Sequence, residues 1–347
     1  MNDSTTDSTT DSTINSPIDK LLDEMDLGRN RRLAKQLVES AFELLNDHPS
    51  LLDLKIASAA LEEMREAFKM FAPFRNIPKV TIFGSARTQM ADPLYMHARD
   101  VATRLADAGW MVVTGAGPGI MQAGMEGAGR DKSIGVSIRL PFEQGANPVI
   151  AGDVKYVSMK YFFTRKLMLI KESKGFVCLP GGFGTLDETF ELLTLTQTGK
   201  GLPVPIVFLD TPGDPYWETV HDFVGRQLVD RGLVAAADTE LYLVTDDCQA
   251  AVDEVLGFYR NYDSIRYVGP MAVMRLKQAP TDSQLAMLNE RFGQFCPDGG
   301  IARATPFEPE RREHDKLDLA RISFTFANHS SGALRELLDT VNSFVDV

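Results

Sequence analysis

Residues 159–200 read MKYFFTRKLMLIKESKGFVCLPGGFGTLDETFELLTLTQTGK. The pattern predicts a helix, a short apolar strand from Gly175 to Leu179, a tight turn from Pro180 to Gly184 and a second helix that begins at Thr185. A turn that joins a buried strand to a helix start directs several backbone N–H groups and the positive end of the helix dipole to one place. Glycines in the turn let the backbone bend and a ligand come close. The stretch therefore predicts a binding site for an anion such as a phosphate group.

Further apolar strands alternate with helices on both sides of this stretch. A continuous apolar strand is predicted from Lys79 to Phe83, and a helix is predicted from Pro93 to Ala108. Strands that alternate with helices at this spacing indicate a parallel sheet in a doubly wound, Rossmann-like α/β fold. Ligands of such sheets bind outside the carboxyl ends of the strands. The other strands of this sheet are predicted at residues 110–114, 133–139, 154–157, 175–179, 205–209 and 241–244.

A second glycine-rich turn, at residues 115–119, follows the second predicted strand. It fails the dinucleotide-binding fingerprint, because Ile120 occupies the place of the third glycine and because the turn does not follow the first strand. A nicotinamide-dependent oxidoreductase is therefore disfavoured. We expect both glycine-rich turns to donate amide hydrogens to a phosphate from neighbouring strand ends. The predicted phosphate-binding residues are Gly115, Gly117, Gly119, Gly181, Gly182, Gly184 and Thr185. Ser85 and Arg87, after the first strand, could either reach the ligand or only form the turn.

The residues from Pro180 to Glu188, PGGFGTLDE, resemble the PGGxGTxxE signature of the LONELY GUY (LOG) family. The segment from Met159 to Met168 resembles the companion pattern of Met, Arg-Lys and Met, and the resemblance extends from about Lys79 to Tyr262. It implies a nucleoside 5′-monophosphate phosphoribohydrolase, a class often labelled "lysine decarboxylase". Such enzymes split AMP or cytokinin riboside 5′-monophosphates into the free base and ribose 5-phosphate.

The resemblance also implies that Arg165 and Glu188 form the catalytic pair. Cleavage of an N-glycosidic bond passes through an oxocarbenium-like sugar, so a carboxylate can offset the developing charge and orient the water. Arg165 is suited to the phosphate or to Glu188, because its guanidinium group is permanently charged and has five donors. The turn at 115–119 resembles the glycine-rich loop of the family, with Ala116 in place of a common glycine. Members of the family usually form dimers or higher assemblies, so a homo-oligomer is expected.

Each of these residues also has a structural interpretation. Thr185-x-x-Glu188 fits a capping box, in which Glu188 bonds back to the amide of Thr185. Arg165 would then be a surface ion-pair partner, and Asp187 would compensate the helix dipole. Lys166 is expected to be an exposed helix residue. Nothing near it resembles a pyridoxal phosphate site, so the decarboxylase label has no support. The alternative function is a nucleotide-binding sensor or scaffold protein with little catalysis.

Composition argues against several other classes of protein. The net charge of −12, without a Lys/Arg-rich block, argues against nucleic acid as a partner. Three separated cysteines fit a reducing compartment, and Cys178 is predicted to be a buried structural thiol. The five histidines lack metal-ligand spacing, so neither a metal site nor a cofactor is expected. No apolar run approaches the roughly 18 residues of a membrane span, and the N-terminus lacks the features of a secretory signal. The chain is therefore expected to act on a small nucleotide in the cytoplasm.

Four segments are predicted along the chain. They are a disordered tail at 1–17, a helical preface at 18–74, a Rossmann-like nucleotide-binding domain at 75–263 and a small α+β domain at 264–347. In the preface, Ser50 and Asp53 predict a capping box at the start of a long helix. The last segment predicts the order β-α-β-β-α, for which a ferredoxin-like fold is one interpretation. Its charged run from Glu308 to Glu313 is predicted to be a solvated loop, and its expected roles are oligomerisation or effector binding.

Overall fold

The computed structural model describes residues 17–140, 145–296, 299–325 and 331–345, so nearly all of the predicted N-terminal tail lies outside the described residues. Contacts between residues divide the chain into two compact units, Met1–Glu62 and Glu63–Val347. Within the described ranges, no helix combines the length and the apolar character needed to cross a membrane.

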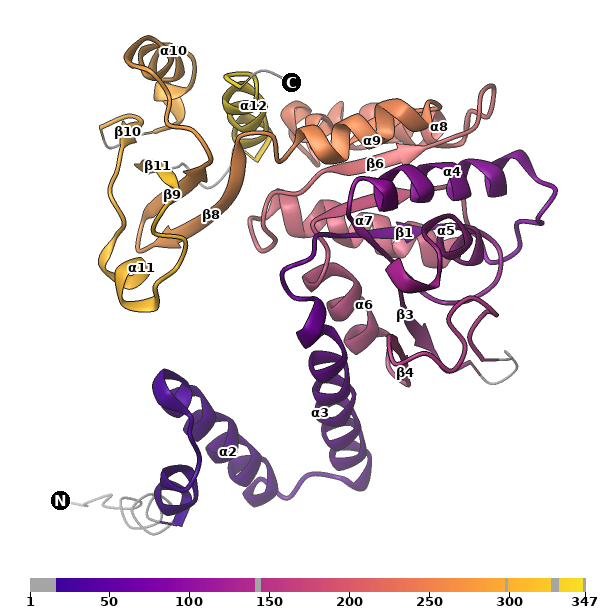
Figure 1. Ribbon diagram of the computed structural model, residues 1–347, viewed down its shortest axis with the longest axis vertical. Coiled ribbons are helices and arrows are strands. Elements are labelled where there is room, and N and C mark those ends of the chain that lie inside the picture. Colours follow the sequence, from indigo (N-terminus) through magenta and orange to yellow (C-terminus); the bar gives the residue numbers. More distant parts are fainter. Residues whose placement is uncertain (1–16, 141–144, 297–298, 326–330, 346–347) are drawn as a thin grey trace. The chain divides into compact units, whose positions relative to one another are not determined.

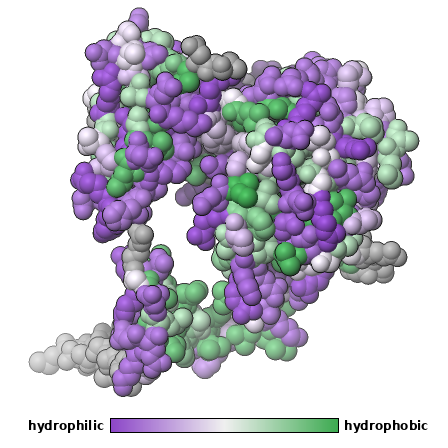
Figure 2. Space-filling view, in the orientation of Figure 1, coloured by the Kyte–Doolittle hydropathy of each residue, from purple (hydrophilic) through white to green (hydrophobic). Residues whose placement is uncertain are grey.

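The first unit is helical. A 3₁₀ turn at Gly28–Asn30 leads into α2 (Arg31–Asn46), and α3 (Leu51–Phe71) begins in the first unit and ends in the second. The predicted capping box is confirmed at the start of α3, where the amide of Asp53 donates to Ser50 Oγ (3.2 Å) and the amide of Ser50 donates to Asp53 Oδ2 (3.0 Å). α2 buries none of its side chains, and apolar surface is visible on the N-terminal helices in Figure 2.

A seven-stranded parallel sheet forms the centre of the second unit (Figure 1). Its strand order is β4-β3-β2-β1-β5-β6-β7, and each neighbouring pair is parallel. The central strands β2, β1 and β5 are buried over their whole length because helices cover both faces. This arrangement confirms the predicted doubly wound, Rossmann-like α/β fold. The strands are β1 (Lys79–Phe83), β2 (Met111–Thr114), β3 (Ser133–Ile138), β4 (Tyr156–Met159), β5 (Gly175–Cys178), β6 (Ile206–Leu209) and β7 (Leu243–Thr245).

The helices of the α/β part form two layers. On one face of the sheet, α4, α5 and α9 pack on side chains such as Val80 and Val112. On the other face, α6, α7, α8 and the end of α3 pack on side chains such as Val113 and Phe176. The helices are α4 (Pro93–Asp107), α5 (Ile120–Ala128), α6 (Phe162–Lys171), α7 (Phe183–Gln197), α8 (Tyr216–Phe223), which continues as a π-helix at Val224–Val229, and α9 (Cys248–Gly257).

The order in which successive strands are added to the sheet reverses at β1. Strands β2 to β4 extend to one side of β1, and β5 to β7 extend to the other. A crevice for ligands forms outside the carboxyl ends of strands at such a switch point. The two glycine-rich turns follow β2 and β5, so the prediction that they leave neighbouring strands was wrong: β1 lies between them. The loop after β1, which begins with Gly84 and Ser85, consequently joins the site between the two turns.

A second sheet, antiparallel and four-stranded, forms the C-terminal part with the order β10-β11-β9-β8. The sequence prediction missed β8, because its residues, YDSIRYV, alternate too weakly to separate them from the preceding helix. β8 forms a hairpin with β9 and precedes the predicted β-α-β-β-α order. That order follows as β9, α10, β10, β11 and α12, with the short helix α11 between β10 and β11. The elements are β8 (Tyr262–Val268), β9 (Met271–Leu276), α10 (Asp282–Phe292), β10 (Ala302–Arg303), α11 (Glu308–Glu313), β11 (Ala320–Thr325) and α12 (Ser331–Asn342).

The charged run that was predicted to be a solvated loop is the short helix α11. Glu310 is 0% exposed and accepts hydrogen bonds from Arg275 Nε (2.9 Å) and Arg275 Nη2 (2.7 Å). Its Oε1 also lies 3.3 Å from Arg321 Nε. The prediction was wrong because two guanidinium groups from neighbouring strands neutralise this carboxylate, and the local charge pattern carries no sign of them.

Candidate active site

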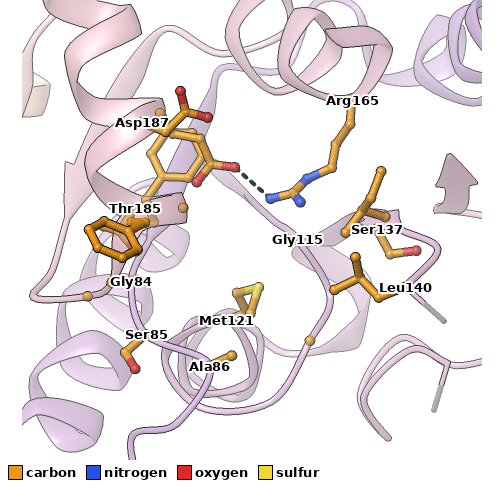
Figure 3. Close-up of a pocket in the computed structure, with 18 of the residues that line it drawn as sticks. Gly84, Ser85, Ala86, Gly115, Met121, Ser137, Leu140, Arg165, Thr185 and Asp187 are labelled. Atoms are coloured by element: carbon orange, nitrogen blue, oxygen red, sulfur yellow. Dashed lines mark hydrogen bonds and ion pairs between the residues drawn. The ribbon is translucent and has the colours of Figure 1, made fainter. Parts of the chain in front are cut away.

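A cavity of about 980 Å³ lies at the carboxyl ends of β1, β2 and β5 (Figure 3). The loops after these strands, the ends of β3 and β4, and the starts of α6, α7 and α8 form its walls. Of the predicted site residues, the lining includes Ser85, Gly115, Gly117, Arg165, Gly181, Gly182, Gly184, Thr185 and Glu188. Gly119 is not part of that lining.

Gly119 instead joins two of the loops. It precedes α5 with a φ of +66°, and a Cβ atom there would lie 2.3 Å from the carbonyl oxygen of Ser85. The next amide, of Ile120, donates to that same oxygen (3.0 Å). Because Gly119 has no side chain, the loop after β2 can approach the loop after β1. Gly119 therefore packs against the loop after β1, outside the lining of the cavity.

The helix after β5 begins earlier than predicted. α7 starts at Phe183 with Gly182 as its N-cap, so Thr185 lies inside the first turn. The first internal hydrogen bond of α7 runs from the amide of Leu186 to the carbonyl oxygen of Gly182 (3.1 Å). The amides of residues 183–185 precede that bond, and groups at this position are the ones a helix offers to an anion.

The three glycines of this turn serve different purposes. A Cβ atom on Gly181 would lie 2.2 Å from Thr185 Oγ1 and 3.1 Å from the amide nitrogen of Ser85, so the close packing of the turn requires a glycine. A Cβ atom on Gly182 or Gly184 would meet no protein atom within 4 Å. These two glycines therefore keep space open in the cavity instead of relieving a clash.

Two hydrogen bonds hold the turn in place. The amide of Ser85 donates to the carbonyl oxygen of Pro180 (3.2 Å), which ties the turn to the loop after β1. The hydroxyl of Tyr216, at the start of α8, donates to the carbonyl oxygen of Gly181 (2.7 Å) and also lines the cavity. Sequence reasoning missed Tyr216, because nothing in its own segment indicates that α8 begins beside this turn.

Ala116, which replaces a glycine common in the family, does not narrow the cavity. It adopts a φ of +57° and is fully buried, and its methyl group packs in a small cluster with Met125 and Ile150. Asn147 holds this loop: its backbone amide donates to the carbonyl oxygen of Ala116 (2.8 Å) and its Nδ2 donates to that of Gly117 (3.0 Å). Sequence reasoning also missed Asn147, which lies in an irregular connection far from the loop in the chain.

Arg165 and Glu188 meet at the side of the cavity. Arg165 Nη2 donates to Glu188 Oε1 over 2.6 Å, the contact drawn as a dashed line in Figure 3. The two side chains are only 12% and 10% exposed. The capping-box interpretation of Glu188 is wrong, because α7 is capped at Gly182 and the carboxylate faces Arg165. Arg165 is likewise not a surface residue.

The surroundings of Glu188 change its acidity. Burial raises the pKa of its carboxyl group to about 7, although the charges of Arg165 and Lys166 act to lower it and those of Asp187 and Glu191 act to raise it. Lys166 was expected to be exposed, but its side chain is 16% exposed and pairs with Asp187 (2.6 Å) and Glu191 (2.9 Å). A carboxyl group with a pKa near neutrality can both accept a proton and carry charge, which suits a general base.

The cavity lining also contains polar and cationic groups, of which the sequence singled out only Arg87. Ser137 Oγ of β3 and the Tyr156 hydroxyl of β4 lie 2.8 Å apart. Arg139 lines the cavity and donates from Nη2 to the carbonyl oxygen of Ser158 (3.1 Å). Arg87, after β1, supplies a second exposed guanidinium group. The cavity therefore offers cations and hydroxyl groups to a ligand that carries both a phosphate and a sugar.

Among the described residues, no group of three or more His, Cys, Asp or Glu side chains could hold a metal ion. The three cysteines are free and buried, and burial raises the pKa of the Cys178 thiol to about 12. The prediction that Cys178 is buried is confirmed. The polar groups of the cavity lining are backbone amides, hydroxyl groups, guanidinium groups and the carboxyl groups of Asp187 and Glu188.

Comparisons with known proteins agree with the signature in the turn. Residues 118–255 match the family model described as "Possible lysine decarboxylase". The chain is 28% identical over 166 residues to the probable cytokinin riboside 5′-monophosphate phosphoribohydrolase LOGL1 of Oryza sativa subsp. japonica, a match that covers 47% of this chain and 70% of the relative. It is 26% identical over 114 residues to the cytokinin riboside 5′-monophosphate phosphoribohydrolase LOG7 of Arabidopsis thaliana, which covers 33% of this chain and 50% of the relative. The resemblance to the LOG family is thereby confirmed.

These matches are partial. The chain spans about half the length of several of these relatives. Among solved structures, the molybdenum cofactor carrier protein of Chlamydomonas reinhardtii is 21% identical, and the match covers 52% of this chain and 99% of that protein with a TM-score of 0.35.

Proposed function

We propose that this chain hydrolyses the N-glycosidic bond of purine nucleoside 5′-monophosphates, AMP or cytokinin riboside 5′-monophosphates, to the free base and ribose 5-phosphate. The observation that carries the proposal is the buried pair of Arg165 and Glu188, 2.6 Å apart, beside a cavity that also receives the N-terminus of α7. The similarity of the chain to phosphoribohydrolases of the LOG family supports the same reaction.

The roles follow from the charges. The amides at the start of α7 and the loop at Gly115 and Gly117 bind the 5′-phosphate. Glu188 stabilises the cationic sugar and accepts a hydrogen bond from the attacking water. As the water oxygen bonds to the anomeric carbon, the bond to the base nitrogen breaks, and a proton from the water ends on the departing base. Arg165 orients the Glu188 carboxylate and adds positive charge near the phosphate.

The test is a screen for base release. The purified protein is incubated with AMP, GMP, IMP, CMP, UMP and a cytokinin riboside 5′-monophosphate, and free base and ribose 5-phosphate are measured together. Release in equal amounts from a purine nucleotide supports the proposal, and no release from the whole panel contradicts it.

The matched variants are Glu188→Gln and Asp187→Asn. Glu188→Gln is expected to lower kcat by about 10²- to 10⁴-fold with an unchanged circular dichroism spectrum, because it removes the charge and the base while keeping the shape. Asp187 also lines the cavity, but its side chain is 58% exposed and bonded to Lys166, so Asp187→Asn should lower kcat less than tenfold. Equal losses in the two variants would contradict the role of Glu188.

The alternative function is a nucleotide-binding sensor or scaffold protein. The contact that favours it is the direct ion pair between Arg165 and Glu188, because a carboxylate already held by a guanidinium group is less free to act as a base. Tight nucleotide binding by calorimetry without base release would establish this alternative.

The proposal includes a homo-oligomeric, cytoplasmic protein that uses no cofactor and binds neither nucleic acid nor membranes. Three free, buried cysteines fit a reducing compartment. Apolar side chains exposed beside the cavity, including Phe162 (51%) and Phe183 (94%), fit a site that lies close to a subunit contact.

A further inference from the structure

The helix that carries Arg165 begins without a cap of its own. The N-cap of α6 is Tyr161, whose side chain makes no capping hydrogen bond, and the first turn contains no acidic residue. The amides at a helix start need acceptors, and a negative charge there is favourable because of the helix dipole. Because α6 supplies no acceptor of its own, a carboxylate from elsewhere in the molecule can accept from the amides at its start.

Glu63 supplies that acceptor from α3. Its carboxylate accepts hydrogen bonds from the amide of Lys160 (2.5 Å), the amide of Tyr161 (3.5 Å) and the hydroxyl of Thr164 (2.7 Å). Glu63 is 4% exposed and Thr164 is 0% exposed, so these contacts are shielded from water. Hydrogen bonds to a charged acceptor are stronger than those between neutral groups, and more so when buried.

The end of α3 is held firmly enough to place this carboxylate. Ala67 and Phe71, one and two turns after Glu63, are buried in the same apolar cluster as Met168 and Leu169 of α6. Figure 1 shows the C-terminal half of α3 beside α6. Glu63 lies outside residues 118–255, which match the family model, and outside the stretch from Lys79 to Tyr262 that resembles the LOG family.

We propose that Glu63 is a positioning residue, which fixes the first turn of α6 and thereby the reach of Arg165 to Glu188. Thr164, which donates to Glu63, directly precedes Arg165, and the amide of Arg165 bonds to the carbonyl oxygen of Tyr161 (3.3 Å) in the same turn. A shift of this turn moves Arg165 relative to α7, which carries Glu188. The last part of the helical preface is then an integral part of the active site. The kinetic part of this inference rests on the proposed hydrolase function, and the structural part does not.

The first test is hydrogen–deuterium exchange on the full-length protein. Glu63→Ala should accelerate exchange of the amides in residues 160–165 by about tenfold to a hundredfold, because it removes a charged acceptor. Glu63→Gln keeps one acceptor oxygen and should give a smaller change. Glu66→Gln, on an exposed position one turn along α3, is the matched control and should leave this segment unchanged. Unchanged exchange at 160–165 in Glu63→Ala, with the protein folded, would overturn the proposal.

The second test separates positioning from general stability. Glu63→Gln and Thr164→Val, assayed well below their melting temperatures, should lower kcat about tenfold and change KM less than threefold, since the phosphate-binding turns belong to other elements. Wild-type kcat in both variants, despite faster exchange at 160–165, would show that Glu63 serves only the fold. If the wild-type protein releases no base, the proposed function fails, while the exchange measurement still decides whether Glu63 holds α6.

Discussion

The Glu188 carboxyl group experiences two opposing effects. Burial favours its neutral form and raises its pKa to about 7, whereas Arg165 and Lys166 favour its charged form. An enzyme that needs Glu188 ionised should therefore lose activity as the pH falls through about 7. Groups whose pKa lies near the working pH are common at catalytic sites, because they change protonation state at low cost.

The first prediction concerns the pH dependence of kcat/KM. In the wild-type protein, kcat/KM should rise with pH and level off above about 7, the pKa of Glu188. Arg165→Gln removes the strongest charge that lowers this pKa. The midpoint of the pH profile of this variant should therefore move to higher pH, and its plateau value of kcat/KM should be lower. A midpoint that stays fixed in Arg165→Gln, measured as base release between pH 5 and 9, would show that another group controls the profile.

The second prediction concerns stability. The folded carboxyl group binds protons more tightly than the model value of 4.5, so the stability of the wild-type protein should decrease as the pH rises from about 4.5 to about 7. Glu188→Gln lacks this titration. In urea denaturation, the free energy of unfolding of Glu188→Gln should equal that of the wild type near pH 4.5. At pH 8 it should exceed the wild-type value by an amount on the order of 3 kcal/mol. A stability difference that is independent of pH would contradict the shifted pKa.

The third prediction compares adjacent positions in the loop after β2. A Cβ atom on Gly115 would lie 2.7 Å from Met121 Sδ and 3.4 Å from Arg165 Nη2, whereas the methyl group of Ala116 already points into the core. Gly115→Ala should therefore raise KM or lower kcat at least tenfold. Ala116→Gly should leave both within about twofold, because the methyl group that it removes packs in a buried cluster and does not line the cavity. Equal effects of the two changes would be inconsistent with this geometry.

At the scale of elements, the C-terminal sheet depends on α11. Arg275 of β9 and Arg321 of β11 are direct partners across the two strands, and like charges in this arrangement are unfavourable. Glu310 lies against both, and Asp315 lies 2.7 Å from Arg275 Nη2. Burial acts to raise the pKa of Glu310. The pKa is nevertheless lowered, because Phe307 and Arg275 donate hydrogen bonds to the carboxylate and because both arginines are positively charged. The short helix is thus the element that allows the two arginines to be buried.

The fourth prediction tests that dependence. Glu310→Ala leaves two buried guanidinium groups without their shared carboxylate and should lower the free energy of unfolding by about 3–5 kcal/mol. Glu308→Ala, on the same helix, removes a carboxylate that is 77% exposed and should cost less than about 1 kcal/mol. Chemical denaturation followed by circular dichroism compares the two variants. A similar small loss in both would mean that the network contributes little to stability.

At the scale of the whole molecule, the second unit combines both sheets. Asn342 of α12 accepts hydrogen bonds from the amides of Asn261 (2.9 Å) and Tyr262 (2.8 Å) and donates to the carbonyl oxygen of Phe258 (2.8 Å). Arg335 of the same helix pairs with Glu254 of α9 (2.5 Å). The last helix of the chain therefore fastens the antiparallel sheet to the parallel one, which explains why the two form one compact unit.

The fifth prediction concerns assembly. Phe163 and Leu167, one turn apart on α6, are 53% and 44% exposed although they lie beside the candidate active site, which favours a contact with a second copy of the chain. Leu167→Glu should lower the native mass at least twofold in light scattering. The control is Met96→Glu on α4, at the other face of the sheet, because Met96 is a similarly exposed apolar residue (51%). This variant should have the same native mass as the wild type. A monomeric wild-type protein would refute the homo-oligomer.

The sequence by itself determined the features that short segments encode. Alternating apolar strands and helices indicated the doubly wound sheet, and the glycines after Cys178 indicated the turn that precedes α7. The signature from Pro180 to Glu188 and its companion segment carried the resemblance that singled out Glu188 and Arg165. The strands, the helices and the turn depend on residues within about ten positions of one another, so the periodicity of side chains and the chemistry of turns suffice to find them. Arg165 and Glu188 were found only through the resemblance to the LOG family.

Only the tertiary structure decided which distant segments meet. In the structure, β1 lies between the two turns and Gly119 packs against the loop after β1 instead of lining the cavity. The hydroxyl of Tyr216 donates to the carbonyl oxygen of Gly181. It also set Glu63 at the start of α6, a contact that spans almost a hundred positions. The physical reason is that each of these contacts depends on the order of the strands and on how the helices pack across them. A carboxylate or hydroxyl group in the chain has the same local pattern whether its partner is water or a buried amide far away.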